Sequence, residues 1–399
     1  MPRPTRRQIL VASITLTVLL LGTAVAVPFR ADAAWQAMAT EVAALRADVV
    51  AATPRRQPLW GEPGPGNAHE HYAAAMALAQ TLGRDHHLEL VALLPHRAAW
   101  QPAGHEALRA RWQELLRHLR AGAAATDVAR SPATGEAAND LHSLIACRWV
   151  ANAAVFEARA LRHEDRHVEA VRWSLDAATF ATDLLRHGPL VDQMIGCAML
   201  AIATMEAWPD TALAELDRAG LDALAIGLRR LDESLPTTLD DRGELLFTAW
   251  HLTHAVGDTG WLPSRADAWR FGFSTRWLLA DAFLAQTARS ERLAATAEAP
   301  WAVRSAALDR EAAIANASGN PLVADFLPNL GNAETSWREV LAHLRLLRLA
   351  VDLHRGAPLP PLVDPIGGGT ITVSERDDVV ELACEAIRDP ARVRRQVAR

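Results

Sequence analysis

The fold is decided by residues 138–208, which read ANDLHSLIACRWVANAAVFEARALRHEDRHVEAVRWSLDAATFATDLLRHGPLVDQMIGCAMLAIATMEAW. Apolar residues recur in this stretch at three- and four-residue spacing, which is the repeat of one face of an α-helix. The polar run at 163–167 and the Gly188-Pro189 pair interrupt the repeat, and Pro209 ends it. The stretch therefore predicts three consecutive helices. Short connections make such helices antiparallel neighbours, as in a helical bundle or a stack of helical hairpins.

The apolar positions of these three helices predict which sides are covered. The first helix, from about Asn139 to Arg162, is apolar nearly all round, so we expect neighbours on most of its sides. The second and third helices each carry one apolar stripe that we expect to face the core. These stripes consist of Val168, Val171, Leu175, Ala178 and Leu185, and of Val191, Met194, Ile195, Ala198, Ile202 and Met205.

Composition favours helix over sheet and limits the classes of function. Half of the 399 residues are hydrophobic, with aromatic residues at only 6% and a single tyrosine, Tyr72. The net charge is -6, and acidic and basic residues are mixed along the chain. The body has no basic stripe, so we expect no nucleic-acid partner. The one basic cluster is the C-terminal tail, where we expect a solvated end. It contains Arg388, Arg392, Arg394, Arg395 and Arg399.

All 41 basic residues are arginine, so the chain contains no lysine. This excludes a Walker-type phosphate loop, Schiff-base chemistry and Ser-Lys dyads, each of which needs a lysine amine. The three cysteines, Cys147, Cys197 and Cys384, match neither a disulfide framework nor a zinc-finger spacing. Cys147 and Cys197 lie on helices predicted to be neighbours, which leaves open either one bridge or buried free thiols.

The N-terminus predicts a membrane anchor. Residues 9–27 contain no charged residue, and their 19 residues span roughly 28 Å as a helix, close to the hydrocarbon thickness of a bilayer. Arg3, Arg6 and Arg7 precede the run, so the positive-inside rule keeps residues 1–8 in the cytoplasm and sends the body across the membrane. We therefore expect a single-pass protein of the bacterial inner (plasma) membrane with a periplasmic body. The alternative is a cleaved signal peptide, for which the apolar run is long.

The remaining chain divides into a stalk, a body and a C-terminal segment. Residues 33–52 predict an amphipathic stalk helix, residues 67–355 an α-helical body, and residues 356–399 a segment that ends in a β-hairpin. The hairpin strands are expected at 370–373 and 379–384 around a polar turn. We expect irregular structure at 53–66, 83–102 and 121–135. The predicted fold class is thus mainly α: a transmembrane helix, a multi-helix bundle or solenoid-like stacked-hairpin body, and a small hairpin.

Two stretches resemble known families. Residues 164–177 are similar to the turn and second helix of one tetratricopeptide hairpin, with Val168-Glu169-Ala170-Val171 after a polar turn. The order Asn320-Pro321, Leu327-Pro328-Asn329-Leu330, Pro358 to Pro361, Asp364-Pro365 and Gly367-Gly368-Gly369 covers about a sixth of the chain. It resembles the C-terminal segment of uncharacterised membrane-anchored bacterial proteins, whose end is similar to that of type II secretion pseudopilins. This resemblance implies an accessory part of a secretion or pilus-like system.

One motif predicts metal chemistry. Residues 163–167, HEDRH, match H-E-x-x-H, in which His163 and His167 on one helix face bind zinc and Glu164 acts as general base. Three features argue against a zinc site. First, the two residues inside the motif are both charged. Second, no downstream histidine extension follows, so a third ligand such as Glu206 must come from elsewhere. Third, the motif falls where we expect a turn between helices.

The other polar clusters have an ordinary structural interpretation. His251 and His254 lie three residues apart on a predicted helix, with Glu244 two turns earlier, and half-buried histidines explain them as well as a metal pair does. Asp240 and Asp241 together with Glu244 are typical of the acidic first turn of a helix. The tryptophans on helical stripes are typical of core, with an aromatic ligand groove as the alternative.

The sequence therefore favours a non-catalytic function. The preferred hypothesis is a membrane-anchored extracytoplasmic helical scaffold that presents a groove to a protein partner, because stacked hairpins leave concave surfaces. The first alternative is a zinc-dependent hydrolase, a peptidase, that uses His163, Glu164 and His167. The second alternative is the accessory secretion or pilus-like component. No other cofactor is expected.

Overall fold

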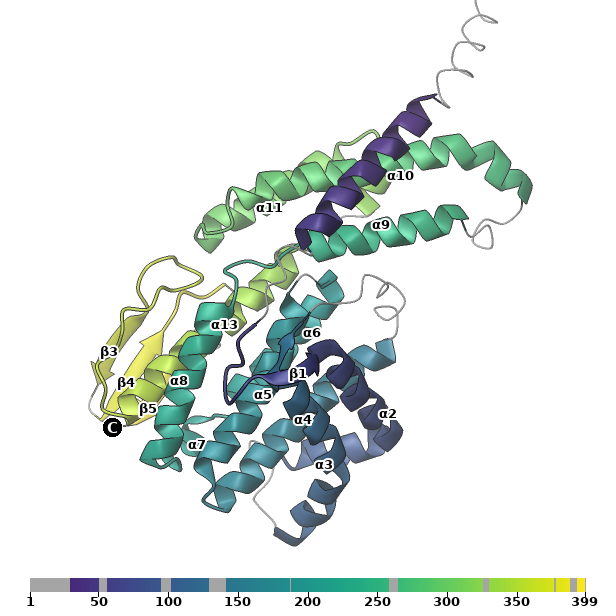
Figure 1. The fold of residues 1–399 in the computed structure, drawn as a ribbon. Helices are drawn as coiled ribbons and strands as arrows, with labels where there is room; N and C mark the ends of the chain where they lie inside the picture. Colours follow the sequence, from purple (N-terminus) through teal and green to yellow (C-terminus); the bar gives the residue numbers. More distant parts are fainter. Residues whose placement is uncertain are drawn as a thin grey trace, which may run out of the picture. The chain divides into compact units, whose positions relative to one another are not determined.

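A computed structural model (Figure 1) describes residues 29–49, 56–94, 102–128, 141–186, 188–257, 265–325, 330–376, 378–387 and 393–398. The chain divides into two compact units. The larger unit comprises residues 49–244, 293–310 and 328–399, and the smaller unit comprises residues 1–48, 245–292 and 311–327. The structure is mainly helical, with a small antiparallel sheet near the C-terminus, as the sequence predicts.

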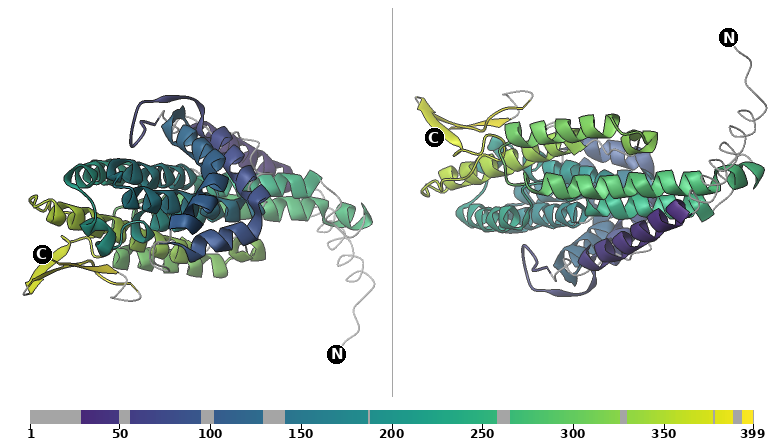
Figure 2. Two further views of the ribbon diagram at one scale, coloured as in Figure 1. Left: turned by 90° about the horizontal axis from the view of Figure 1, so that it is seen from below. Right: turned by 90° about the horizontal axis from the view of Figure 1, so that it is seen from above.

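The larger unit is organised around helix α5 (His167–Leu185). Helix α5 contacts α3 (Pro102–Ala124), α4 (Leu141–His163), α6 (Leu190–Ala201) and α8 (Arg218–Ser234), and Figures 1 and 2 show these helices alongside it. Helix α4 is buried at every position from Val150 to Arg162, which confirms the prediction of a helix covered on most sides. Helix α5 is buried from Trp173 to Leu185, so its single predicted stripe was too narrow. Neighbours on all sides explain the difference.

Helix α6 corrects the prediction for the third helix of the central stretch. It continues into one π-helical turn, Ile202–Glu206, and of its predicted core stripe only Ile202 is fully buried. The buried side instead carries Gln193, Gly196, Cys197, Met199 and Leu200. A Cβ atom on Gly196 would lie 2.8 Å from the carbonyl oxygen of Ala181, so this glycine lets α6 approach α5 closely. Because both sides of α6 are apolar, this close approach decides which side faces the core.

A short parallel strand pair and a helical hairpin form the N-terminal part of the larger unit. Strand β1 (Gly64–Asn67) pairs with β2 (Ala125–Asp127), and α2 (Ala68–Ala92) and α3 lie between them in sequence. The Asn67 side chain accepts a hydrogen bond from the backbone N–H of His69 at 2.8 Å and so caps α2.

Two segments predicted as irregular are partly regular. Helix α2 continues to Ala92 through a break at Gly83, whose φ of 82° only glycine adopts readily. The predicted irregular segment 83–102 is therefore helical over its first ten residues. Helix α3 likewise continues to Ala124, and β2 follows, where the sequence predicted a loop from 121.

The second half of the larger unit packs helices against the C-terminal sheet. Helix α13 (Leu330–His354) contacts α6, α7 (Asp210–Ala214), α8 and two strands, and α11 (Trp301–Asn316) begins in this unit. The sheet has the antiparallel order β3 (Thr372–Arg376), β4 (Val379–Ala383) and β5 (Arg394–Ala398).

The third strand corrects the predicted two-stranded hairpin. Part of the basic tail forms β5, in which Val397 is buried opposite Val380 of β4. Arg395, predicted to lie in a solvated end, donates a hydrogen bond to the Asp210 carboxylate at 2.6 Å. Strand β3 also continues through Arg376, into the predicted turn.

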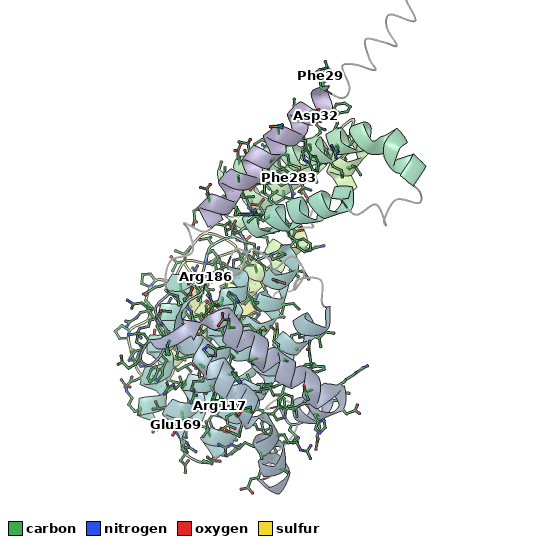
Figure 3. All side chains as sticks on the ribbon, turned by 45° about the vertical axis from the view of Figure 1, so that its right-hand side comes forward. Phe29, Asp32, Arg117, Glu169, Arg186 and Phe283 are labelled. Carbon is green, nitrogen blue, oxygen red and sulfur yellow. The ribbon has the colours of Figure 1, made fainter. Side chains whose placement is uncertain are left out.

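The smaller unit contains the helix of residues 29–49, most of α9 (Arg242–Gly257) and α10 (Arg265–Ala294), the end of α11, and α12 (Pro321–Asp325). Met38 and Leu45 of the first helix are buried against Leu245, Leu279 and Phe283. The predicted stalk stripe is therefore covered by other helices of its own unit. Figure 3 labels the buried Phe283 and, at the first turn of the 29–49 helix, Phe29, which is 72% exposed.

Within the described part of the chain, no helix combines the length and apolar character needed to cross a membrane. The predicted anchor, residues 9–27, lies outside the described residues.

Candidate functional site

The H-E-x-x-H motif occupies a turn between two helices. Helix α4 ends at His163, and α5 begins at His167. Asp165 has a positive φ of 57°, and the backbone N–H of Arg166 turns back to the carbonyl oxygen of Leu161 at 2.9 Å. The two histidines therefore do not stand one helical turn apart on a continuous helix, the spacing on which zinc binding by this motif depends.

The side chains of the motif have structural partners. The Glu164 carboxylate binds Arg109 and, at 3.1 Å, Arg166. Burial opposes ionisation of Glu164, but the two guanidiniums outweigh it and hold the pKa of this carboxyl below its ordinary value, which does not suit a general base. His167 Nδ1 accepts a hydrogen bond from the backbone N–H of Asp217 at 2.9 Å. Among the described residues, no group of three or more His, Cys, Asp or Glu side chains is arranged to hold a metal ion.

The other predicted candidates lie apart from one another. His251 and His254 lie on α9, but their side chains are outside the described part of the structure. Glu244 is in the first turn of α9, where its carboxylate accepts a hydrogen bond from the backbone N–H of Leu190 at 2.7 Å. Glu206, the suggested third zinc ligand, lies on the π-helical turn and is half-buried. The three cysteines are buried thiols, and Cys147 and Cys197 are not bridged to each other.

Sequence reasoning missed a buried polar network in the larger unit. The Arg56 guanidinium lies 3.1 Å from the Asp183 carboxylate and donates to the carbonyl oxygens of Gly122 and Ala123 at 2.6 and 2.8 Å. The Tyr72 hydroxyl donates to the same carboxylate at 2.8 Å. Burial, and then the charge of Asp183, raise the pKa of Tyr72, so the phenol stays protonated as a donor. The network joins α2, the end of α3 and α5. Its role is therefore structural.

A second buried ion pair lies two turns earlier on α5. Asp176 accepts a hydrogen bond from Arg120 Nε at 2.9 Å, and the Arg120 guanidinium lies 3.4 Å from the ring centroid of Trp173. Burial raises the pKa of Asp176 to about 6, against the lowering effect of Arg120. An acidic residue seven positions before Asp183 in an apolar helix was the available sequence signal, but it did not identify the arginine partners.

The surface feature that suggests a function is the outward side of α6. We define the α6 stripe as Val191, Met194, Ile195, Ala198 and Met205. Val191 and Met205 are each 38% exposed, and the three residues between them are half-buried. On α4, which contacts α6, Ile145 is 47% exposed. Single exposed apolar residues are ordinary, whereas a row of them along one helix face is typical of a binding surface.

Comparison with known proteins adds no family or fold assignment. No protein-family model matches the chain, no curated protein matches it, and no solved structure matches it.

Proposed function

We propose that the protein is a membrane-tethered, extracytoplasmic helical module that binds a protein partner through the α6 stripe. The observation that supports this function is the α6 stripe, whose end residues Val191 and Met205 are exposed and whose middle residues are only half-buried. Its two methionines are unbranched and flexible, so they adapt to an apolar surface. Each 100 Å² of apolar surface that a partner covers contributes roughly 2.5 kcal/mol before the entropic cost of association.

The tether is supported by the sequence at the N-terminus. The uncharged run of residues 9–27 is long enough for one transmembrane helix, and three arginines precede it. The described chain begins just after this run, with Phe29 and Arg30. We therefore propose that the body lies on the periplasmic side of a bacterial inner membrane.

Site-specific photo-crosslinking in cells tests the binding surface. A photoreactive amino acid at Met205 should give a discrete adduct, whereas the same residue at the exposed Glu233 of α8 should give none. Val191→Glu places a charge on the α6 stripe without altering the core, so it should abolish the adduct at Met205 while the thermal unfolding midpoint is retained. Identical adducts at Met205 and Glu233, or no adduct from correctly localised protein, would contradict the proposal.

Membrane fractionation tests the tether. The full-length protein should resist alkaline carbonate extraction, and intact-mass measurement should show residues 1–27 retained. Removal of residues 1–27 should release the body. Recovery of the intact chain in the soluble cytosolic fraction would refute the anchor, and cleavage after Ala26 would replace it with a signal peptide.

A further inference from the structure

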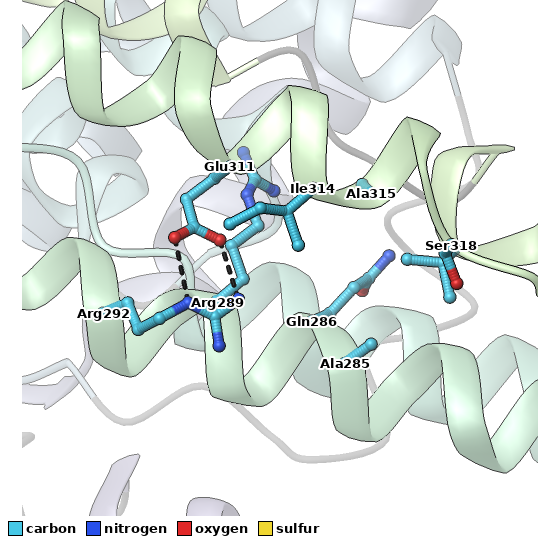
Figure 4. Close-up of a pocket in the computed structure, with 9 residues that line it drawn as sticks. Ala285, Gln286, Arg289, Arg292, Glu311, Ile314, Ala315 and Ser318 are labelled. Carbon is cyan, nitrogen blue, oxygen red and sulfur yellow. Dashed lines mark hydrogen bonds and ion pairs between the residues drawn. The ribbon is translucent and has the colours of Figure 1, made fainter.

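An arginine that is paired within the protein leaves little charge for a ligand, and a pair that lines a cleft of the smaller unit illustrates this (Figure 4). Arg292 of α10 donates two hydrogen bonds to Glu311 of α11, from Nε to Oε1 at 2.9 Å and from Nη2 to Oε2 at 2.7 Å. The two charges compensate each other. An arginine without such a partner, in contrast, is a candidate for binding an anion.

Arg172 of α5, in the larger unit, has no such partner. Among the described residues it forms neither an ion pair nor a hydrogen bond, although it is half-buried and its Nε atom is buried. The guanidinium lies against the backbone of Gly61, since a Cβ atom on Gly61 would be only 2.9 Å from Arg172 Nη2. Glu62, the next residue, is exposed and pairs with no described residue. The positive charge of Arg172 therefore has no direct counter-charge within the described chain.

Two carboxylates lie within electrostatic range of Arg172, and both are bound by other arginines. Asp176 accepts a hydrogen bond from Arg120 Nε at 2.9 Å. Glu169, which Figure 3 labels, accepts from Arg166 Nε at 3.0 Å and from Arg166 Nη2 at 2.6 Å. Each carboxylate already binds a closer cation, so neither compensates Arg172 fully.

Arg120 of α3 provides a second guanidinium beside the same carboxylate. Its side chain is 28% exposed, and its planar head lies over the ring of Trp173, 3.4 Å from the ring centroid. Nε binds Asp176, whereas Nη2 is buried and has no hydrogen-bond acceptor among the described residues. Arg120 and Arg172 therefore share one carboxylate, and both retain N–H groups for another acceptor.

The charges around Asp176 do not balance. Three guanidiniums lie within its electrostatic range, those of Arg56, Arg120 and Arg172. Arg56 is paired with Asp183 at 3.1 Å, which leaves Arg120 and Arg172 with the single charge of Asp176. A cation that is partly withdrawn from water is costly unless negative charge replaces the water. An anion from solution supplies that charge, and the partial exposure of both side chains gives it access.

The arrangement also selects the kind of anion. Two guanidiniums from different helices present several donors, and the four oxygens of a tetrahedral oxyanion can accept from both. A divalent anion is attracted by two cations more strongly than a halide or a monocarboxylate is. We infer that Arg120 and Arg172 bind hydrogen phosphate at the surface of the larger unit. This site belongs to α3 and α5 and is separate from the α6 stripe.

Isothermal titration calorimetry of the purified full-length protein in mild detergent tests this site. Sodium phosphate is the titrant at about pH 8, where phosphate is divalent, and sodium chloride keeps the ionic strength constant. We expect saturable binding of one phosphate per chain. Sodium sulfate, which has the same shape and charge, should bind within about threefold of phosphate, whereas sodium acetate should bind at least about tenfold more weakly. Arg172→Gln should weaken phosphate binding about tenfold to a hundredfold, because it removes charge-assisted hydrogen bonds.

Two further variants separate binding from folding. Asp176→Asn removes the carboxylate that competes for both guanidiniums, so it should strengthen phosphate binding at least about threefold, and it decides the question if Arg172→Gln does not fold. Arg111→Gln is the matched control: Arg111 is a 44% exposed arginine of α3 that binds Glu89, and its loss should leave the affinity within about twofold. The inference is wrong if neither phosphate nor sulfate binds saturably to wild type, if acetate binds as tightly, if Arg172→Gln and Arg111→Gln have equal affinity, or if Asp176→Asn binds phosphate no more tightly than wild type.

Discussion

Asp183→Asn should be one of the most destabilising polar substitutions in the larger unit. The carboxylate side chain is fully buried and holds the Arg56 guanidinium at 3.1 Å and the Tyr72 hydroxyl at 2.8 Å. The asparagine amide has nearly the same shape, but it carries no charge. The variant therefore leaves Arg56 as a buried cation without its counter-charge, while its hydrogen bonds to Gly122 and Ala123 remain.

The magnitude follows from what remains after the substitution. Removing one partner of a buried ion pair costs about 3–5 kcal/mol, most of it the penalty of an uncompensated charge. The asparagine Oδ1 atom still accepts a hydrogen bond from Tyr72, and the two carbonyl oxygens still accept from Arg56. These retained contacts place the expected loss of unfolding free energy near the lower end, at about 3 kcal/mol.

Urea denaturation of the purified full-length protein in mild detergent, followed by far-ultraviolet circular dichroism, measures this loss. Asp309→Asn is the matched control, since Asp309 is exposed on α11, and it should change the unfolding free energy by less than about 0.5 kcal/mol. A double variant, Asp183→Leu with Arg56→Met, removes both charges and should be less destabilising than Asp183→Asn. An Asp183→Asn protein as stable as the Asp309→Asn control would refute the reasoning that this network joins the helices.

Three other predictions follow from the same contacts. The pKa of Asp176 is raised to about 6 in the folded protein, so the native state binds this proton more tightly than the unfolded chain does. The associated stabilisation of about 3 kcal/mol is complete below the unfolded pKa and is lost as the pH rises through about 6. Urea denaturation between pH 4 and 7 should therefore show an unfolding free energy that falls with pH in wild type and not in Asp176→Asn. Gly196→Ala should lower the unfolding free energy by about 1–2 kcal/mol, because its Cβ would lie 2.8 Å from the Ala181 carbonyl oxygen. The control Gly331→Ala, whose Cβ would meet no neighbouring atom within 4 Å, should be neutral or stabilising by about 0.5 kcal/mol. Thermal denaturation measures both variants. His167→Ala should lower the unfolding free energy by about 1 kcal/mol, because it removes the hydrogen bond from the backbone N–H of Asp217. If elemental analysis found stoichiometric zinc in the wild type and none in this variant, the turn geometry would be contradicted.

The helices were predictable from the sequence because their signals are local. The apolar composition of α4 and the polar run at 163–167 identified a covered helix and the turn after it, and both are observed. Sequence reasoning missed strand β5 because Arg394, Arg395 and Gln396 are polar, and Val397 is the one buried residue within this strand. Its pairing with β4 depends on residues elsewhere in the chain, which local composition does not report.

The buried network was not predictable for a related reason. Arg56, Tyr72 and Asp183 are far apart in the sequence, and each residue alone is typical of an exposed or half-buried position. Their meeting depends on how α2, α3 and α5 pack. Periodicity indicates which face of each helix is apolar, but it does not indicate which helix covers that face.

Helix α6 shows how this limit bears on function. Its apolar residues surround the helix, so the sequence identified the α6 stripe but assigned it to the core, whereas the close approach at Gly196 turns the opposite side inwards. An apolar side chain that stays 38% exposed, as Val191 and Met205 do, leaves part of its burial free energy unrealised in the isolated unit. That free energy becomes available when another apolar surface covers the stripe. The residues whose orientation the sequence predicted wrongly are therefore the same residues that support a binding partner.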